Sequence, residues 1–454
     1  MNISAPPRLD LLDVIARPVP RYTSYPTGPH FTCAVTPQVY ADWLGKVRAT
    51  WEPISLYLHI PFCRSICTYC GCTTKAARKD EPLRAYAEAL HREIALVAEH
   101  LGPVEVAHLH WGGGTPNILP SDCLEALVRD LRERFTFLPT MEHAIELDPR
   151  HVTAEGALLL GQLGVNRASL GVQTLDETVQ TAIGRLQPLE IVEAAFGHLR
   201  AAGIDRINAD LMYGLPHQTT ADVVRTAREV ARLGPARVAL FGYAHVPWMK
   251  PHQKLIDEAT LPQTDQRLAQ ANAARAKLIE CGYASVGIDH FALPEDPLAV
   301  AARTGTLHRN FQGYTDDSAS TLIGIGVSSI SRTPNGYAQN APDQRGWLRS
   351  VEAGHLPIAR GKAFDADDQL RADVIEDLLC DFACDLDALA ALHGANPAVF
   401  DDELFGLDVF VREGWVTVSG RKVVIRQHRP ELARLVAAQF DRYLNKAGRH
   451  SVAV

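Results

Sequence analysis

The chain has 454 residues, enough for two or three domains, and 46% of them are apolar, so a large core can be buried. Its 45 Lys and Arg against 53 Asp and Glu give a net charge of −8, which argues against a general binder of nucleic acids or anionic membranes. No apolar run reaches the roughly 18–20 residues of a membrane span and the first ten residues lack a signal pattern, so we expect a cytoplasmic protein that does not bind membranes.

The first 50 residues are rich in proline and show little periodicity. Proline fixes the backbone angle φ and interrupts regular hydrogen bonding, so this stretch is expected to form an irregular arm. One helix is expected near its end, at Pro37–Thr50.

From Ser55 to about Gly242, short apolar runs alternate with amphipathic stretches. The runs predict strands at Ser55–Ile60, Val104–Trp111, His143–Leu147, Arg167–Val172, Arg206–Met212 and Arg237–Phe241. The stretches predict helices at Leu83–Leu101, Ser121–Phe135, Ala154–Leu163, Leu189–Ala202 and Thr219–Leu233. Six such units predict an α/β fold with a parallel sheet, either a partial barrel or a doubly wound sheet. In both, the functional site lies at the carboxyl ends of the strands.

The rest of the chain follows a different sequence pattern. A helix at Thr264–Cys281 and a strand at Ala284–Asp289 are followed by Gly/Ser-rich loops, helices within Ala366–His393 and a hairpin around Ser419–Gly420. The acidic total favours a capping role for this part over DNA binding. We therefore expect three parts: an N-terminal arm (1–50), a core that carries the cofactors (51–292) and a mostly helical C-terminal domain that covers the active site (293–454).

Four of the nine cysteines lie within ten positions, directly after the first predicted strand. Cys63, Cys67 and Cys70 form a C-x3-C-x2-C pattern, and Cys72 follows. Three thiolates on one loop can bind three corners of a 4Fe–4S cube and leave the fourth iron open. A zinc site, a redox pair at Cys67 and Cys70, or a structural cluster are the alternatives. A zinc site is less favoured because no second ligand pair of the usual spacing follows. A redox pair would leave the neighbouring cysteines without a role, and a structural cluster would need a fourth ligand.

This pattern resembles the radical S-adenosylmethionine (SAM) superfamily. The resemblance implies a partial (β/α)6 barrel, one 4Fe–4S cluster held by the three cysteines, and SAM bound at the open iron. Cleavage of SAM would then give a 5′-deoxyadenosyl radical. The spacing specifies the superfamily and leaves the substrate open.

Further motifs narrow the resemblance to the anaerobic coproporphyrinogen oxidases, over essentially the whole chain. The motifs are Pro20–Thr27 (PRYTSYPT), Cys70–Cys72 (CGC), His110–Pro116 (HWGGGTP), Gly287–Ala292 (GIDHFA), His308–Thr315 (HRNFQGYT) and, more weakly, Tyr337–Asn340 (YAQN). This family oxidatively decarboxylates two propionates of coproporphyrinogen III to give protoporphyrinogen IX in haem synthesis. The related haem chaperones typically lack the leader motif and the fourth cysteine. A chaperone and a radical SAM enzyme with another substrate remain the alternatives.

Polar residues at successive strand ends suit the cofactor. Glu146, Gln173 and Asp210 suit ribose hydroxyls and an ammonium group, Arg185 suits a carboxylate, and glycines allow close approach of a ligand. The resemblance implies two SAM molecules that divide one set of contact residues between them: Tyr57, Tyr69, Gly113, Gly114, Thr115, Glu146, Gln173, Arg185, Asp210, Ala244 and Ile330.

No catalytic residue is identified from the sequence. Candidates are Cys72, His59, His290, His308 and Arg309. Arg21, Arg309 and the basic run Arg421–Arg449 are candidate partners for acidic substrate groups, although a solvated basic face explains most of that run equally well. We expect a monomer that acts on a tetrapyrrole and takes electrons from a donor that the sequence does not identify.

Overall fold

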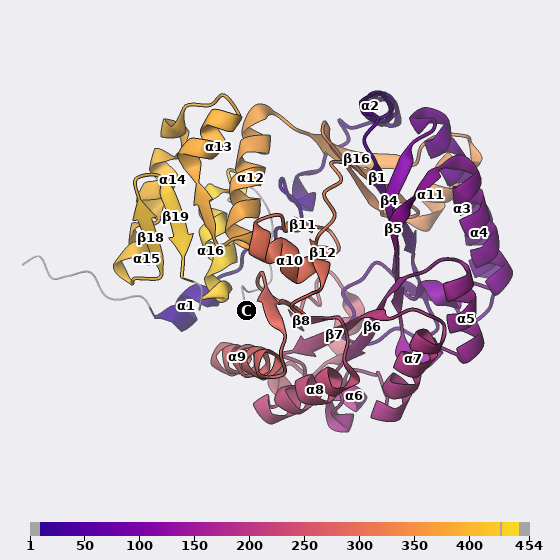
Figure 1. Cartoon of the computed structure of the whole chain (residues 1–454), viewed down its shortest axis with the longest axis horizontal. Helices are drawn as coiled ribbons and strands as arrows, with labels where there is room; N and C mark the ends of the chain where they lie inside the picture. The colour runs from indigo at the N-terminus through magenta and orange to yellow at the C-terminus, as the bar shows by residue number, and fades with distance from the viewer. Residues whose placement is uncertain (1–9, 427–428, 445–454) are drawn as a thin grey trace, which may run out of the picture. The chain divides into compact units, whose positions relative to one another are not determined.

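The computed structural model describes residues 10–426 and 429–444, which fall into two compact units (Figure 1). The sheet unit comprises residues 31–261 and 317–363. The helical unit comprises the residues up to 30, residues 262–316 and those from 364 onward. Each unit collects segments that are distant in sequence. The three-part division at 50/51 and 292/293 stays a prediction.

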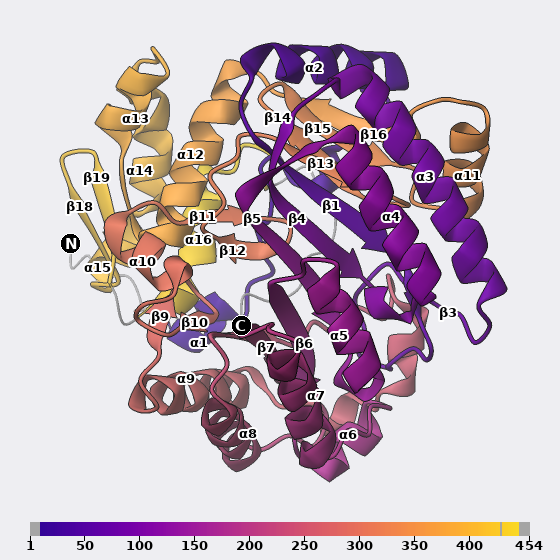
Figure 2. The ribbon, with the colours of Figure 1, turned by 45° about the vertical axis from the view of Figure 1, so that its right-hand side comes forward.

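Six parallel strands form the centre of the sheet unit, and they confirm the expected α/β fold (Figure 2). In spatial order they are β1 (Ile54–Ile60), β4 (Glu105–Gly113), β5 (Thr136–Leu147), β6 (Arg167–Gln173), β7 (Arg206–Tyr213) and β8 (Arg237–Gly242). Each strand overlaps one of the six predicted from apolar runs. Because the strands are parallel, their carboxyl ends meet at one edge.

Helices connect these strands, and most of them were predicted from their 3.6-residue periodicity. The predicted ones are α3 (Glu81–Leu101), α4 (Ser121–Arg134), α5 (Ala154–Gln162), α7 (Leu189–Ala201) and α8 (Thr220–Leu233), while α6 (Glu177–Ala182) was not predicted. The expected helix α2 (Pro37–Thr50) precedes β1. Local signals set their starts. Thr219 and Asp222 form a reciprocal capping box at the start of α8, and the Thr153 hydroxyl accepts a hydrogen bond from the Gly156 N–H at the start of α5.

The sheet extends beyond β1 on the side away from β4. Here β13 (Leu322–Ile325) runs parallel to β1, and β14 (Ile330–Thr333), β15 (Gly336–Asn340) and β16 (Ile358–Ala363) follow antiparallel, with α11 (Gln344–Glu352) between the last two. The expectation of loops here was wrong. These strands are short, and β15 is buried along its whole length, so no alternation of polar and apolar residues marks it.

Two very short strands bracket the cysteine loop. β2 (Phe62–Cys63) pairs in parallel with β3 (Lys75–Ala76). The cysteines therefore lie on a loop whose two ends are joined by a ladder.

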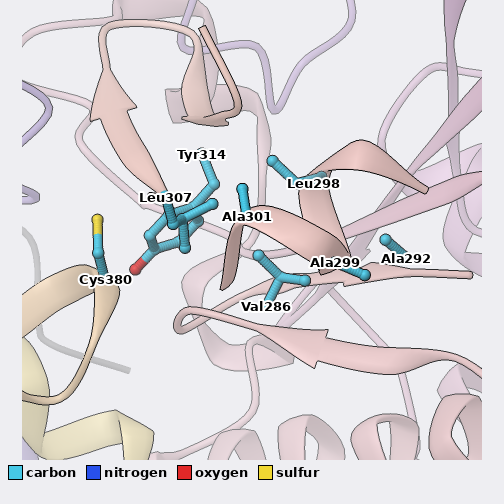
Figure 3. Packing of buried hydrophobic residues seen from close by; sticks show 8 residues of the cluster. All are labelled: Val286, Ala292, Leu298, Ala299, Ala301, Leu307, Tyr314 and Cys380. Atoms are coloured by element: carbon cyan, nitrogen blue, oxygen red, sulfur yellow. The ribbon is translucent and has the colours of Figure 1, made fainter. Parts of the chain in front are cut away.

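In the helical unit, α1 (Leu11–Ile15) packs against α9 (Thr264–Glu280). The strand predicted at Ala284–Asp289 is shorter than expected. Gly287, with φ of 55°, starts a turn between β9 (Ala284–Val286) and β10 (His290–Ala292), which pair as a hairpin. A Cβ on Gly287 would collide with the Tyr314 ring, so only glycine fits at this turn. α10 (Pro297–Thr304), Leu307 just before β11 (His308–Asn310), Tyr314 in β12 (Gly313–Thr315) and Cys380 complete the buried cluster of Figure 3.

The remainder of this unit is mostly helical, as predicted. Its elements are α12 (Ala366–Cys380), β17 (Ala383–Asp385), α13 (Leu386–Leu392), α14 (Asp401–Gly406), α15 (Asp408–Arg412), β18 (Val416–Ser419), β19 (Lys422–Ile425) and α16 (Ala433–Ala437). The β18–β19 hairpin confirms the turn predicted at Ser419–Gly420, and β17 pairs with β19 beside it. Among the residues that the structure describes, no helix is both long enough and apolar enough to cross a membrane.

Candidate functional site

The cysteine loop lies at the carboxyl end of β1, where the parallel sheet was expected to place its site. Cys67 is buried, Cys63 and Cys70 are half-buried, and Cys72 is exposed; all four are free thiols. Gln253 Nε2 donates to the carbonyl oxygen of Tyr69 at 2.9 Å, which places Tyr69 against the segment after β8.

Hydroxyl groups flank the first cysteine. Thr115 Oγ1 donates to Cys63 Sγ at 3.4 Å, and Thr74 Oγ1 lies 3.4 Å from the same sulfur. Burial raises the pKa of the Cys63 thiol, and these two hydroxyls partly offset that effect. Thr115, predicted to contact the cofactor, thus lies beside the first predicted iron ligand.

Two guanidinium groups reach the second cysteine. Arg185 Nη1 lies 3.6 Å and Arg150 Nη2 3.9 Å from Cys67 Sγ, and both arginines form ion pairs with Asp148. Arg185 also donates to the carbonyl oxygen of Gly171 and to Gln187. The N–H groups of Arg185, which were expected to bind a carboxylate, therefore already bind groups of the protein. Sequence reasoning missed Arg150 and Asp148, although both closely follow the strand-end residue Glu146.

The third cysteine has a lowered pKa. A hydrogen bond from Cys72 is the largest influence that lowers the pKa of the Cys70 thiol to about 6, and the nearby His252 and Lys250 side chains contribute. A thiolate is the form that binds metals. His252 and Lys250 belong to the segment after β8 and were also missed.

This donor set fits an iron–sulfur cluster. Three sulfurs lie on one loop, and hydroxyl, guanidinium and thiol groups around them stabilise negative charge on sulfur. Within the described residues, no three His, Cys, Asp or Glu side chains converge as around a single ion. Cluster ligands bind three different iron atoms at the corners of a cube, so such convergence is not required of them.

The glycine run after β4 owes its composition to packing. A Cβ on Gly112 would lie 2.8 Å from Glu146 Oε1, one on Gly113 would lie 2.6 Å from the His59 ring, and one on Gly114 would lie 2.4 Å from the Phe62 carbonyl oxygen. The N–H groups of Gly113 and Gly114 are also engaged, by Glu146 and by the Ile60 carbonyl. The run thus brings β1, β4 and β5 together, and its contact with the cofactor stays a prediction.

Glu146, at the end of β5, is an acceptor within this packing. Oε1 lies 3.2 Å from His110 Nε2, and Oε2 accepts from Gly113 N at 3.1 Å. Burial alone would raise the pKa of Glu146, but these two bonds hold it below its ordinary value. The Tyr57 ring stacks on His110 at 5.8 Å, so three side chains from neighbouring strands meet here.

His59 links the sheet to the cysteine loop. Its Nδ1 lies 3.0 Å from the Tyr57 hydroxyl and its Nε2 lies 3.0 Å from the Thr73 carbonyl oxygen. Burial lowers the pKa of His59, which keeps the ring neutral. The structure therefore gives His59 a positioning role beside Cys72, and a chemical role for either residue stays a prediction.

The other predicted cofactor residues lie at further strand ends of the same edge. Gln173 has φ of 65°, an uncommon backbone conformation for this residue type that is often found at functional sites. Asp210, in β7, accepts from Ser169 and Asn208. Ala244 follows β8, and its carbonyl oxygen accepts from Gln253. Ile330 begins β14, next to the turn at 326–329.

That turn is held by a group that the sequence did not suggest. Glu93, on α3, is only 1% exposed and accepts hydrogen bonds from Gly326 N (2.8 Å), Trp347 Nε1 (2.7 Å) and Asn340 Nδ2 (2.5 Å). Tyr86, on the same helix, accepts from Val327 N and donates to the carbonyl oxygen of His59 at 2.7 Å. One helix thus fixes both the turn and the end of β1.

The remaining candidates belong to the helical unit. His290 Nδ1 lies 2.8 Å from Asp289, and His308 Nδ1 lies 3.1 Å from Glu376. The Arg309 guanidinium stacks on the Tyr314 ring at 4.4 Å and donates weakly to the Arg21 carbonyl oxygen at 3.5 Å. Each of these side chains already has a partner within its own unit, and a role toward substrate stays a prediction.

The leader motif and part of the basic C-terminal run pack against each other within this unit. The Tyr22 hydroxyl donates to Asp441 at 3.0 Å, and the Tyr25 hydroxyl accepts from Arg442 N at 3.2 Å. Arg442 forms ion pairs with three aspartates of the α12 start: Asp365, Asp367 and Asp368. Arg421 pairs with Asp401. The run is therefore partly neutralised; its members beyond residue 444 lie outside the described residues.

Comparison with known proteins agrees with this arrangement. The radical SAM superfamily model matches residues 57–230. The oxygen-independent coproporphyrinogen III oxidase of Bradyrhizobium diazoefficiens is 45% identical over 438 residues, 96% of this chain and 97% of the relative. That of Paracoccus denitrificans is 42% identical over 454 residues, 98% and 99% of the two chains.

A solved structure covers nearly the same length. Coproporphyrinogen III oxidase from Escherichia coli, described as a radical SAM enzyme, matches with a TM-score of 0.89 at 38% identity. The match covers 93% of this chain and 98% of that one. The similarity therefore includes the arm and the C-terminal segments as well as the parallel sheet.

Proposed function

The chain belongs to the family of oxygen-independent coproporphyrinogen III oxidases, and we propose that it converts two propionates of coproporphyrinogen III to vinyl groups, giving protoporphyrinogen IX. It is a radical SAM oxidoreductase of porphyrin synthesis. Each round removes a hydrogen atom, one electron and carbon dioxide from one propionate. The observation that carries the proposal is the C-x3-C-x2-C loop at the carboxyl end of β1, in a chain that matches these relatives over nearly its whole length.

The enzyme uses one 4Fe–4S cluster and SAM. When bound, the cluster supplies one electron to SAM, which supplies the 5′-deoxyadenosyl radical that removes the propionate hydrogen. Cys63, Cys67 and Cys70 would hold the cluster. Two molecules of SAM per chain are part of the proposal, which the resemblance suggested, and the predicted contacts extend from Ile330 in β14 across to Ala244 after β8.

Residues of the sheet unit would position these groups. The carboxylate of Glu146, whose pKa is lowered, suits an ammonium group, and the half-buried Gln173 and Asp210 suit hydroxyls. Arg185 and Arg150 would act from behind Cys67 and stabilise the charge on its sulfur. His59 would keep the segment after Cys70 in place through its contact with Thr73.

Other features of the proposal extend the sequence predictions. We place the protein in the cytoplasm, because free thiols in a metal-binding loop suit a reducing compartment. It would act as a monomer, with an N-terminal arm and a C-terminal domain that exclude water from the radical. Deletion of residues 1–30 should then lower the decarboxylation rate; a full rate would contradict the covering role.

The deciding experiment is anaerobic reconstitution with iron and sulfide. The loaded protein is given SAM, a one-electron reductant and coproporphyrinogen III, and the product is measured by mass. Loss of two carbon dioxide units, abolished in Cys67→Ser, is the expected result. Cleavage of SAM without decarboxylation would show that the substrate is wrong. A reduced cluster that cleaves no SAM would contradict the enzyme assignment.

A further inference from the structure

Two segments of the sheet unit are basic in an acidic chain. Residues 61–79 and 243–256 contain six Lys and Arg and no Asp or Glu. The rest of the chain contains 39 Lys and Arg and all 53 Asp and Glu. The bases are Arg64, Lys75, Arg78, Lys79, Lys250 and Lys254. Such a local excess gives one region a positive potential that the net charge conceals.

The two segments form one continuous region around the cysteine loop. Lys250 Nζ donates to the Cys72 carbonyl oxygen at 2.9 Å, and His252 Nε2 lies 2.7 Å from that of Cys70. β3, with Lys75, pairs with β2 beside Cys63. The two segments therefore meet at the loop that would hold the cluster.

Four acids directly follow the two segments: Asp80, Glu81, Asp257 and Glu258. Asp80 pairs with Arg64 at 2.8 Å, and Glu258 binds His245 at 3.0 Å. Lys79 and Lys254 are exposed side chains, as are Lys75 and Arg78. Four exposed bases thus remain available on this region.

Large apolar side chains are exposed in the same region. Trp248 is 49%, Met249 64% and Leu255 76% exposed, all within eight residues of a segment that touches the cysteine loop. Aromatic residues, Met and Arg are enriched in protein interfaces. We call this region, comprising Lys75, Arg78, Lys79, Lys254, Trp248, Met249 and Leu255, the basic face.

We propose that the basic face is the docking surface for a small acidic protein that carries one electron to the cluster. The inference rests on the proposed function, because each cleavage of SAM consumes one electron that must reach the iron. A donor protein that binds here lies against the peptide segments next to Cys63, Cys70 and Cys72. Opposite charges accelerate its association, and the exposed apolar side chains supply contact area.

The test compares two matched double variants of the full-length, reconstituted protein. Lys79→Glu/Lys254→Glu reverses two charges on the basic face. Lys46→Glu/Arg129→Glu reverses two exposed charges on α2 and α4, and changes the net charge equally. None of the four residues contacts the cysteines or the predicted cofactor residues. Cluster reduction is followed by absorbance in stopped flow, with reduced plant-type ferredoxin as the acidic donor and dithionite as the small-molecule donor.

The ferredoxin rate constant should fall about tenfold or more in the basic-face variant and less than about twofold in the control. It should fall with added salt in the wild type and much less in the basic-face variant. Dithionite is itself a small anion but makes no docking contacts, so its rate constants in the two variants should differ from the wild type by less than about threefold. Equal losses in both variants, no loss in either, or a wild-type cluster that ferredoxin does not reduce would overturn the proposal. Because reduction is measured without tetrapyrrole, a wrong substrate would leave this result unchanged.

Discussion

Two loops at neighbouring strand ends of the sheet unit are organised in opposite ways. The cysteine loop after β1 presents free thiols next to hydroxyl and guanidinium donors, a set of groups that suits a metal cluster. The turn 326–329 after β13 is satisfied by the protein itself, through Glu93, Tyr86 and Asn340. Since β13 pairs directly with β1, the two loops meet at one edge. The comparison indicates that one loop presents side chains suited to a cofactor, while the other provides a rigid edge beside it.

The largest expected effect is on the cofactor-dependent loop. Cys67→Ser removes a thiolate ligand and should abolish cluster assembly, because serine is a poor ligand for iron–sulfur clusters. The unfolding free energy of the protein without cluster should change by only about 1 kcal/mol. Iron and sulfide analysis with chemical denaturation measures both quantities. A full complement of cluster in the variant would contradict the ligand assignment.

At the turn 326–329, which protein groups hold in place, a substitution should mainly change the unfolding free energy. Glu93→Ala leaves the buried N–H groups of Gly326 and Trp347 Nε1 without an acceptor, each costing about 1–3 kcal/mol, whereas Asn340 Nδ2 keeps other acceptors. The unfolding free energy of the cluster-free protein should therefore fall by about 3 kcal/mol or more, measured by denaturant titration. A loss below about 1 kcal/mol would show that the turn is not held by this carboxylate.

The same carboxylate predicts a pH dependence. Burial raises the pKa of Glu93 from 4.5 to about 7, even though its three hydrogen bonds oppose the shift. Between these values the folded protein keeps a proton that the unfolded chain releases. The contribution to stability is therefore full below pH 4.5 and is lost as the pH rises through about 7, a change of about 3 kcal/mol. Denaturant titrations across this range should show that slope in the wild type and not in Glu93→Gln, and equal slopes would refute the assignment.

A pair of glycine substitutions gives the smallest effect. Gly326 has φ of 101°, and an added Cβ would lie 2.6 Å from both the His59 carbonyl oxygen and the Tyr86 hydroxyl. Gly326→Ala should cost about 1–3 kcal/mol. Gly71→Ala, in the cysteine loop, meets nothing within 4 Å and should change the unfolding free energy by less than about 0.5 kcal/mol. Thermal unfolding of the two variants without cluster measures this difference, and equal values would contradict it.

The cysteine loop could be predicted from the sequence, because its functional residues are neighbours in the chain. The turn 326–329 could not, because the residues that hold it are far apart in the chain. Cys63, Cys67 and Cys70 are recognisable because one loop supplies all three ligands at fixed spacing. The partners of Glu93 lie more than 230 residues away in sequence, on elements that were themselves not predicted. One signal was available: Glu93 follows Tyr86 and Leu90 at helical spacing, on the buried side of α3.

The six central strands were predictable for a related reason. Runs such as Ile54–Ile60 are buried on both faces of a parallel sheet, so they are mostly apolar, with Ser55 and His59 as the exceptions. The strands β13 to β16 are short and contain Gly, Ser and Asn, so composition alone suggested loops. Their pairing partners, and not their own residues, determine that they are strands.

The ladder between β2 and β3 has a thermodynamic consequence for cluster assembly. It closes the cysteine loop into a ring of about a dozen residues, and closing a flexible ring of that length costs roughly 2 kcal/mol in chain entropy. This chain entropy is lost when β2 and β3 pair during folding, before iron binds. The loop then loses less conformational freedom when it takes up the cluster, and metal affinity increases without any additional ligand.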